Sequence, residues 1–257
     1  MDRPREPLPT RVEDTPPLPA AYADALAEGL AALGLTLTAS AREAIDGQAR
    51  LLLAWTGAIN LTAIRDPAAV ARGHVVDSLT ALPALRERGV ERFLDLGSGG
   101  GYPGLPLAAA LPARQALLVE PIRKKAAFLA TAATATGLQD TVTAAAVRAE
   151  ALAADARHRG RWPAVTARAV ASLAELVELA FPLLRPGGVL VAWKRDDLED
   201  EWAAAERAVS ALGGGTLELL SVSAPGLTGH VLVVGTARGS APAAYPRDPG
   251  ARRRRPW

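Results

Sequence analysis

The sequence predicts an α/β protein in which helices cover both faces of a mostly parallel sheet, with a helical extension before it. From Arg92 onward, short apolar runs alternate with helical patterns, and a glycine-rich loop follows the first run at 93–96. This alternation is typical of parallel sheets, because two parallel strands need a long crossover, usually a helix, between them. The last two expected strands, 217–222 and 231–236, are joined by a glycine- and proline-containing loop, which predicts an antiparallel hairpin at the end of the sheet.

The remaining elements follow from periodicity and capping signals. Apolar residues at helical spacing predict three helices before the sheet, over 20–33, 40–55 and 67–88, the second with Ser40 as N-cap and Glu43 as its capping-box partner. The other expected strands span 116–120, 142–147, 164–167 and 189–193, and further helices are expected after Pro103 and over 123–136. The chain thus divides into a disordered proline-rich leader (1–19), a helical extension (20–90), the sheet-bearing core (91–237) and a disordered basic tail (238–257).

The loop after the first strand indicates a nucleoside-binding function. Asp95 precedes Gly97, Gly99 and Gly101, and Glu120 closes the next apolar run. Glycine lacks a Cβ atom, so the backbone can take positive φ and approach a ligand closely. An acid at the tip of the second strand is placed to accept hydrogen bonds from ribose hydroxyls. We therefore predict an S-adenosylmethionine pocket that includes these three glycines and Glu120, and hence a methyltransferase.

Two other interpretations of this loop stay open at this stage. Residues 99–104 also match the G-x-G-x-x-G pattern of dinucleotide-dependent oxidoreductases. Asp95 argues against that class, because a carboxylate adds negative charge where a pyrophosphate would sit over helix amides. A purely structural glycine turn is the third interpretation, but the closely spaced glycines and two strand-end acids exceed what a turn needs.

Composition excludes several classes of protein. The hydrophobic content of 49% suits a buried core, and no apolar run reaches the roughly 20 residues of a membrane span. The first residues lead into prolines and not into an apolar signal core, so we expect a soluble cytoplasmic protein. With no cysteine and only three scattered histidines, we expect no disulfide, no cysteine nucleophile and no metal site. The sequence contains no heptad pattern, which favours a monomer.

Six short motifs, taken together, resemble one known family. They stand at 60–62, 74–79, 95–104, 124–129, 148–150 and 167–169. In order and spacing these segments resemble the bacterial small-subunit rRNA guanine-N7 methyltransferases called RsmG or GidB, over about residues 50–237. The resemblance implies a Rossmann-like class I methyltransferase fold and S-adenosylmethionine contacts at Gly97, Tyr102, Ala149, Glu150 and Arg168. This chain departs from the family pattern at Thr56 and Gly73, and Arg72 could restore the basic charge missing at the latter.

The residues also restrict which atom could be methylated. Methylation at pyrimidine C5 normally needs a cysteine nucleophile, and exocyclic amines are usually handled by an Asn or Asp followed by Pro-Pro, whereas 166–170 reads Thr-Ala-Arg-Ala-Val. Guanine N7 carries no proton and has an in-plane lone pair, so the protein mainly has to position the reactants. We therefore expect no indispensable base. Arg168 and His74 are positioning candidates, although His74 could equally be a satisfied core histidine.

The resemblance implies that the partner is 16S rRNA or a small-subunit ribosomal particle. Arg123, Lys124 and Lys125 could contact phosphates or form an ordinary solvated helix face, and Lys194 at a strand tip could touch phosphate. The run 252–255 is interpreted as a solvated, composition-biased tail in preference to an RNA-binding arm. Two alternatives stay open: a methyltransferase for a small molecule or protein, and a non-catalytic regulatory module that binds the cofactor.

Overall fold

A seven-stranded sheet in the order β3-β2-β1-β4-β5-β7-β6 forms the centre of the computed structural model, which describes residues 7–257. The strands are β1 (Arg92–Leu96), β2 (Gln115–Val119), β3 (Val142–Ala145), β4 (Trp162–Arg168), β5 (Leu184–Arg195), β6 (Gly215–Ser221) and β7 (His230–Ala237). The first five strands pair in parallel, and β7 runs antiparallel between β5 and β6. The predicted antiparallel hairpin at the end of the sheet is confirmed.

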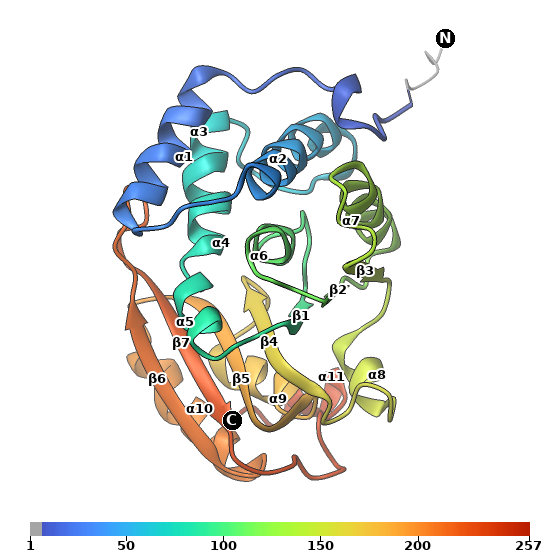
Figure 1. Cartoon of the computed structure of the whole chain (residues 1–257). Coiled ribbons are helices and arrows are strands. Elements are labelled where there is room, and N and C mark those ends of the chain that lie inside the picture. The colour runs from blue at the N-terminus through green and yellow to red at the C-terminus, as the bar shows by residue number, and fades with distance from the viewer. Residues whose placement is uncertain (1–6) are drawn as a thin grey trace.

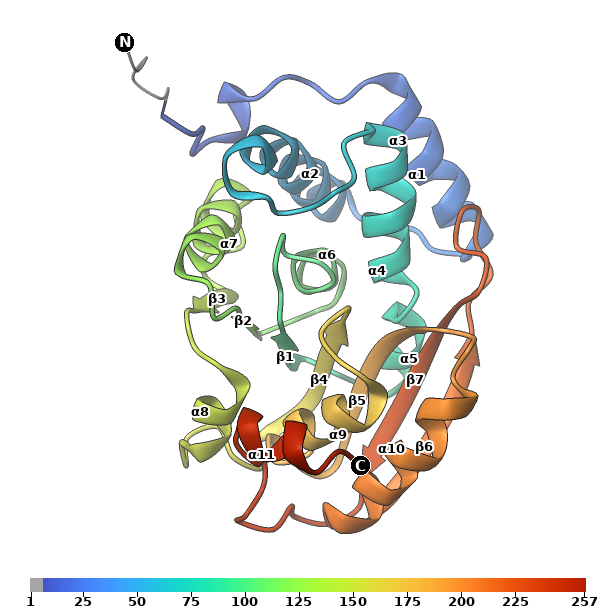
Figure 2. The same cartoon turned by 180° about the vertical axis from the view of Figure 1, so that it is seen from behind.

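Helices cover both faces of this sheet. They are α1 (Ala20–Ala32), α2 (Ala39–Ile59), α3 (Pro67–Val70), α4 (Asp77–Leu79), α5 (Leu82–Glu87), α6 (Gly104–Ala110), α7 (Arg123–Ala135), α8 (Ala149–Ala154), α9 (Leu173–Ala180), α10 (Glu199–Ala211) and α11 (Pro249–Arg254), with a 3-10 turn η1 (Val12–Asp14) and a π-helical segment η2 (Ala71–Val76). The N-terminal helices gather at the end of the molecule opposite α10 and α11 (Figures 1 and 2).

Alternate strand residues divide the core into two layers. On β1, Phe93 packs in the cluster that contains Leu52 of α2 and Leu105 of α6, whereas Leu94 packs with Leu176 of α9 on the other face. Because successive side chains of a strand point to opposite faces, a strand covered on both sides needs apolar residues throughout. This explains why the strands of the core read as continuous apolar runs.

Two predicted helices differ from the structure. The second begins at Ala39, and its N-cap is Thr38, whose hydroxyl accepts a 3.2 Å hydrogen bond from the Ala41 amide. Ser40 lies inside the helix, so the predicted capping box with Glu43 is wrong. The expected single helix over 67–88 is divided. Its middle forms the wider π-helical segment η2, and beyond it the Thr80 hydroxyl donates a 2.6 Å hydrogen bond to the Asp77 carbonyl, in competition with the helix backbone.

The chain ends are more ordered than the composition suggested. Of the leader, residues 1–6 lie outside the described residues. Beyond them, the Trp55 indole donates to the Pro9 carbonyl at 2.7 Å, and Arg50 donates to that of Pro16 at 3.0 Å. The tail contains α11, with Arg252 buried against the core. The expectation of disorder rested on proline and charge content. Composition does not reveal hydrogen-bond and packing partners that distant segments of the chain provide.

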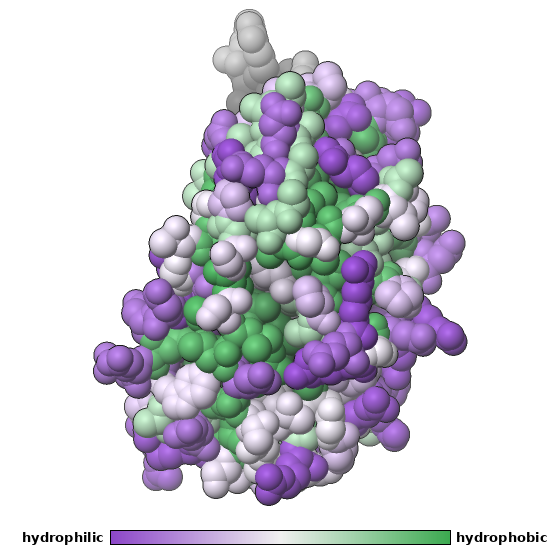
Figure 3. Space-filling model, turned by 60° about the vertical axis from the view of Figure 1, so that its left-hand side comes forward, coloured by the Kyte–Doolittle hydropathy of each residue, from purple (hydrophilic) through white to green (hydrophobic). Residues whose placement is uncertain are grey.

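Apolar side chains are also visible on the molecular surface. Figure 3 shows the side formed by α1 and the β6–β7 hairpin, where apolar residues gather across the middle and hydrophilic ones surround them. Leu219 of the edge strand β6 is 48% exposed. Among residues 7–257, the helices are all too short or too polar to cross a membrane.

Candidate active site

The main cavity lies at the carboxyl ends of the parallel strands. β1 is central, with β2 on one side and β4 on the other, so the chain connections diverge at this point. Ligands of open α/β sheets bind at such a switch point. The cavity has a volume of about 500 Å³, within the range of about 300–1,000 Å³ typical of small-molecule sites.

The glycine loop forms one wall of this cavity. Gly97, Gly99 and Gly101 have φ values of 70°, 52° and 88°. The Gly97 and Ser98 amides donate to the Val119 carbonyl at 2.8 and 3.1 Å, which ties the loop to the end of β2. Gly97 and Gly99 line the cavity, whereas Gly101 packs behind the loop, where a Cβ would lie 2.6 Å from the Leu105 side chain. Gly101 therefore shapes the loop from behind.

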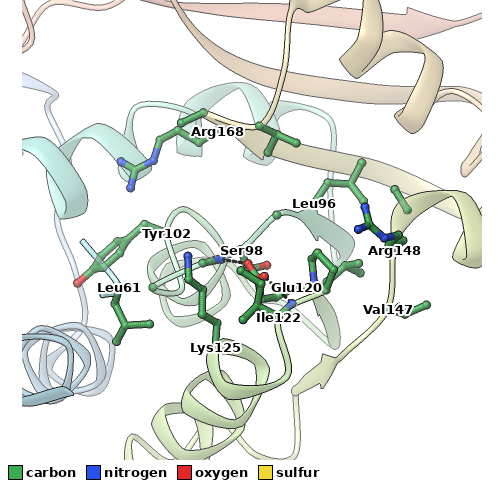
Figure 4. A pocket seen from close by; sticks show the side chains of 18 of the residues that line it. Leu61, Leu96, Ser98, Tyr102, Glu120, Ile122, Lys125, Val147, Arg148 and Arg168 are labelled. Carbon is green, nitrogen blue, oxygen red and sulfur yellow. Dashed lines mark hydrogen bonds between the residues drawn. The ribbon is translucent and has the colours of Figure 1, made fainter. Parts of the chain in front are cut away.

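Glu120 lies between this loop and the start of α7. Its carboxylate accepts hydrogen bonds from the Gly99 amide at 3.1 Å and the Ile122 amide at 2.8 Å, and the residue is 5% exposed. In Figure 4 it occupies the centre of the cavity lining, with Tyr102 and Arg168 on one side and Val147 and Arg148 on the other. Two backbone donors fix the carboxylate at the place where the sequence predicted a ribose-binding acid.

The opposite end of the cavity is formed by the start of α8. Ala149 and Glu150, two of the predicted cofactor contacts, follow β3 and line the cavity. Glu150 pairs with Arg252 of α11, and Arg252 also lines the cavity. Arg252 is not among the predicted site residues, because the basic run 252–255 favours interpretation as a solvated tail.

Arg168 is fixed by partners from the helical extension. It ends β4 and donates to Asp77 Oδ2 at 2.8 Å and to the Gly73 carbonyl at 3.0 Å. Asp77 is buried, and its other carboxylate oxygen lies 2.9 Å from His230 Nδ1. Asp77 was not predicted as a site residue, although it stands in one of the six motifs. This buried carboxylate links η2 and α4 to the ends of β4 and β7.

His74 has both ring nitrogens engaged. Nε2 lies 2.6 Å from the Thr62 hydroxyl and Nδ1 lies 3.1 Å from Arg168 Nη2. Nδ1 also lies 3.2 Å from the Gly73 carbonyl, which can only accept, but the Arg168 guanidinium is its nearer neighbour and can only donate. We therefore assign the proton to Nε2, which donates to Thr62. Burial, reinforced by the charge of Arg168, lowers the pKa of His74 to about 4. The ring is therefore neutral at pH 7, and it belongs to a π-helical segment, a feature frequent at functional sites.

Tyr102 completes this side of the cavity. Its ring stacks on His74 with 4.9 Å between centroids, and the Arg168 guanidinium lies 5.7 Å from its centroid. The residue is 5% exposed and lines the cavity. Tyr102, His74 and Arg168 thus form one packed group.

Residues 42–228 match the model of the GidB family, described as rRNA small subunit methyltransferase G. The chain belongs to this family. It is 40% identical over 233 residues to ribosomal RNA small subunit methyltransferase G of Roseiflexus sp. (strain RS-1), covering 91% of this chain and 99% of that protein. It is 42% identical over 202 residues to the protein of that name from Deinococcus radiodurans, covering 78% and 79%. The predicted family is confirmed, and with it an S-adenosylmethionine-dependent methyltransferase.

Solved structures confirm the fold of this GidB-family chain. An O-methyltransferase from Bacillus cereus in complex with SAH superposes with a TM-score of 0.57 at 16% identity, over 75% of this chain and 91% of that one. The O-methyltransferase TomG from Streptomyces achromogenes in complex with SAM superposes with a TM-score of 0.53 at 19% identity, over 80% and 92%. The predicted Rossmann-like methyltransferase fold is confirmed, and the oxidoreductase interpretation is dropped.

The cavity of this GidB-family protein fits the cofactor chemically. A nucleoside has ribose hydroxyls that donate, and the Glu120 carboxylate is held at the cavity with acceptor capacity left. Apolar side chains at Leu96, Ile122 and Val147 offer surfaces against which a planar adenine can pack. The other strand-end acid, Asp95, is fully buried beneath the loop and accepts a 2.7 Å hydrogen bond from the Thr166 hydroxyl. It supports the loop from below.

The basic residues predicted to contact RNA lie in different surroundings. Arg123 and Lys124 are exposed at the start of α7, while Lys125 turns toward the cavity and lines it (Figure 4). Lys194 pairs with Glu201 at 2.6 Å and is only 13% exposed, so its charge is already neutralised. Within residues 7–257, three or more His, Cys, Asp or Glu side chains never come together in a way that could hold a metal ion.

Proposed function

We propose that this protein transfers the methyl group of S-adenosylmethionine to N7 of a guanine in 16S rRNA, presented by the RNA or by a small-subunit particle. The cofactor, bound in the 500 Å³ cavity, supplies a methyl group on a sulfonium, which an unprotonated ring nitrogen can attack directly. Gly97, Gly99, Tyr102, Glu120, Ala149, Glu150 and Arg168 would hold it, with Gly101 shaping the loop behind.

The observation that carries the proposal is the state of His74. It is the one imidazole that lines the cavity, and Thr62 and Arg168 occupy both of its nitrogens. A neutral imidazole whose nitrogens are both occupied is not available as a general base. Such a site suits guanine N7, a nucleophile from which no proton has to be removed. Arg168 and His74 would then act by position, which is sufficient when the reactants are held in line.

A second cavity of about 450 Å³ is the proposed place for the guanine. It shares His74, Ala169 and Arg168 with the first cavity, so the two open onto the same group of residues. Trp193, Lys194 and Arg195 line its other side. Because N7 lies on the deep, narrow major-groove edge of A-form RNA, we expect an unpaired or opened guanine as substrate. Arg123, Lys124 and Lys125 would contact neighbouring phosphates.

The test is methyl transfer from labelled S-adenosylmethionine to purified small ribosomal subunits and to free 16S rRNA. We expect label at one guanine, and the modified strand should break there after borohydride reduction and aniline treatment, which detect N7-methylguanine. Label on another base, on protein only, or on a small metabolite only would contradict the proposal. Binding of the cofactor without transfer to any substrate would favour a regulatory module.

A further inference from the structure

The C-terminal segment 238–257 lies beyond the residues that match the family model and packs on the α8 and α9 side of the sheet (Figure 2). Arg159 anchors its beginning by donating to the carbonyls of Ala241, Pro242 and Tyr245 at 3.1, 2.8 and 2.9 Å. Three backbone acceptors on one guanidinium define the path of this segment toward α11.

A buried carboxylate holds the end of the segment. The Glu178 side chain on α9 is completely buried and accepts from Arg247 Nε at 2.9 Å and from the Trp257 indole at 2.6 Å. Burial raises the pKa of Glu178, but hydrogen bonds from Arg247 and Trp257 outweigh burial, so the net pKa is lowered. Without the segment this carboxylate would lose its cationic partner, so the segment is an integral part of the fold.

Arg252 is the residue through which the C-terminal segment reaches the cofactor cavity. It lies on α11, whose N-cap Asp248 accepts from the Ala251 amide at 2.9 Å, and it is 9% exposed. Its Nε donates to Glu175 at 2.9 Å, and its Nη2 donates to Glu150 Oε1. Among residues 7–257, no hydrogen bond reaches Glu150 Oε2, so this oxygen remains available as an acceptor.

We propose that Arg252 is a positioning residue for the cofactor, holding Glu150 so that its second carboxylate oxygen can accept a hydrogen bond from the amino group of adenine. A glutamate side chain has several freely rotating bonds, and a guanidinium on one oxygen restricts them. Glu175 of α9 in turn holds the Arg252 guanidinium, so the guanidinium is oriented by one acid on α8 and one on α9. The proposal rests on the cofactor lying in this cavity.

Calorimetric titration of S-adenosylmethionine into the full-length protein tests it. We expect R252Q to raise the Kd for the cofactor about tenfold. R252K keeps the positive charge but lacks the planar guanidinium that bonds Glu150 and Glu175 together, so its Kd should lie between those of R252Q and wild type. The exposed arginine of the same helix provides the control, since R254Q should bind as wild type does. In turnover, R252Q should raise the KM for the cofactor about tenfold and leave kcat and the KM for RNA within twofold.

A double-mutant cycle separates positioning from general loosening. If Arg252 acts through Glu150, the R252Q effect on the Kd should largely disappear in an E150Q background, and the unfolding midpoints of the variants show whether they are folded. Wild-type affinity in R252Q, or an undiminished R252Q effect in the E150Q background, would overturn the proposal. Failure of the wild-type protein to bind the cofactor would overturn the cavity assignment itself, and the proposal with it.

Discussion

Arg168, at the end of β4, donates a 2.8 Å hydrogen bond to Asp77, a residue 91 positions earlier in the chain whose side chain is only 3% exposed. This pair joins the helical extension to the sheet at the wall shared by the two cavities. The Arg168 side chain, which borders both the cofactor cavity and the proposed guanine cavity, is therefore held in place by Asp77 of the helical extension.

Breaking this pair should damage activity and stability together. R168Q should lower kcat/KM by about a hundredfold, because small misplacements of positioning groups have effects of that size. D77N leaves the buried guanidinium without its counter-ion and should lower the free energy of unfolding by about 3 to 5 kcal/mol. Radiolabel transfer and urea unfolding measure the two effects. R157Q, which breaks the exposed pair with Asp155, should change neither, and wild-type transfer by R168Q would remove Arg168 from the site.

Gly97 should tolerate no side chain, for a reason beyond backbone strain. A Cβ there would lie 2.6 Å from Val170 Cγ2, at a φ of +70°. We expect G97A to raise the Kd for S-adenosylmethionine more than tenfold, with partial recovery in G97A/V170A. Gly89 has a φ of +59° and open space around its Cβ position, so G89A should show only the strain of about 1 to 2 kcal/mol and normal binding. Equal binding by G97A and wild type would contradict the assigned loop role.

Glu120 should matter for binding more than for the rate of transfer. E120Q replaces one acceptor oxygen by a donor that faces a backbone amide, and a hydrogen bond to a charged group contributes about 1.5–3 kcal/mol. We expect the cofactor Kd to rise at least about tenfold, with a smaller change in kcat, as measured by calorimetry and initial rates. E87Q, at a glutamate whose side chain is 82% exposed, is the matched control. An unchanged Kd in E120Q would show that the ribose lies elsewhere.

His74 should not produce a titration in the rate near neutral pH. Its pKa is lowered to about 4, chiefly by burial, so the ring stays neutral from about pH 5 upward. We expect kcat for wild type and for H74Q to depend on pH in the same way between pH 5.5 and 8, even though H74Q turns over more slowly. A wild-type limb near pH 6.5 that H74Q abolishes would show that the imidazole exchanges a proton during turnover.

Asp95 should make stability depend on pH. Burial raises its pKa from 3.8 to about 6, so the folded state binds the proton more tightly than the unfolded state does. The resulting stabilisation is complete below about pH 4 and is lost as the pH rises through 6, a change on the order of 3 kcal/mol. Urea unfolding between pH 4.5 and 7.5 should show that the free energy of unfolding of wild type falls relative to that of D95N, whose side chain does not titrate. The prediction would be contradicted if the free energies of the two proteins depended on pH in the same way.

The sequence by itself determined the sheet and the cofactor loop. Local signals suffice for both: apolar runs covered on two faces mark the strands, and Gly97, Gly99 and Glu120 follow the ends of β1 and β2 at fixed spacing. The carboxyl ends of neighbouring parallel strands necessarily meet at one edge of the sheet. The cofactor class therefore followed from this spacing, and the family from the resemblance of the six motifs.

Only the tertiary structure decided the partners of these residues. Asp77 reaches Arg168, and Arg252 reaches Glu150, across long stretches of chain that no periodicity relates. Lys194, which looks free in the sequence, is paired with Glu201. The tail looked disordered because composition reports how much apolar surface a segment can bury by itself. Its order comes from acids on α8 and α9 that pair with its arginines, above all Glu178, whose need for a cation arises from its complete burial in the folded protein.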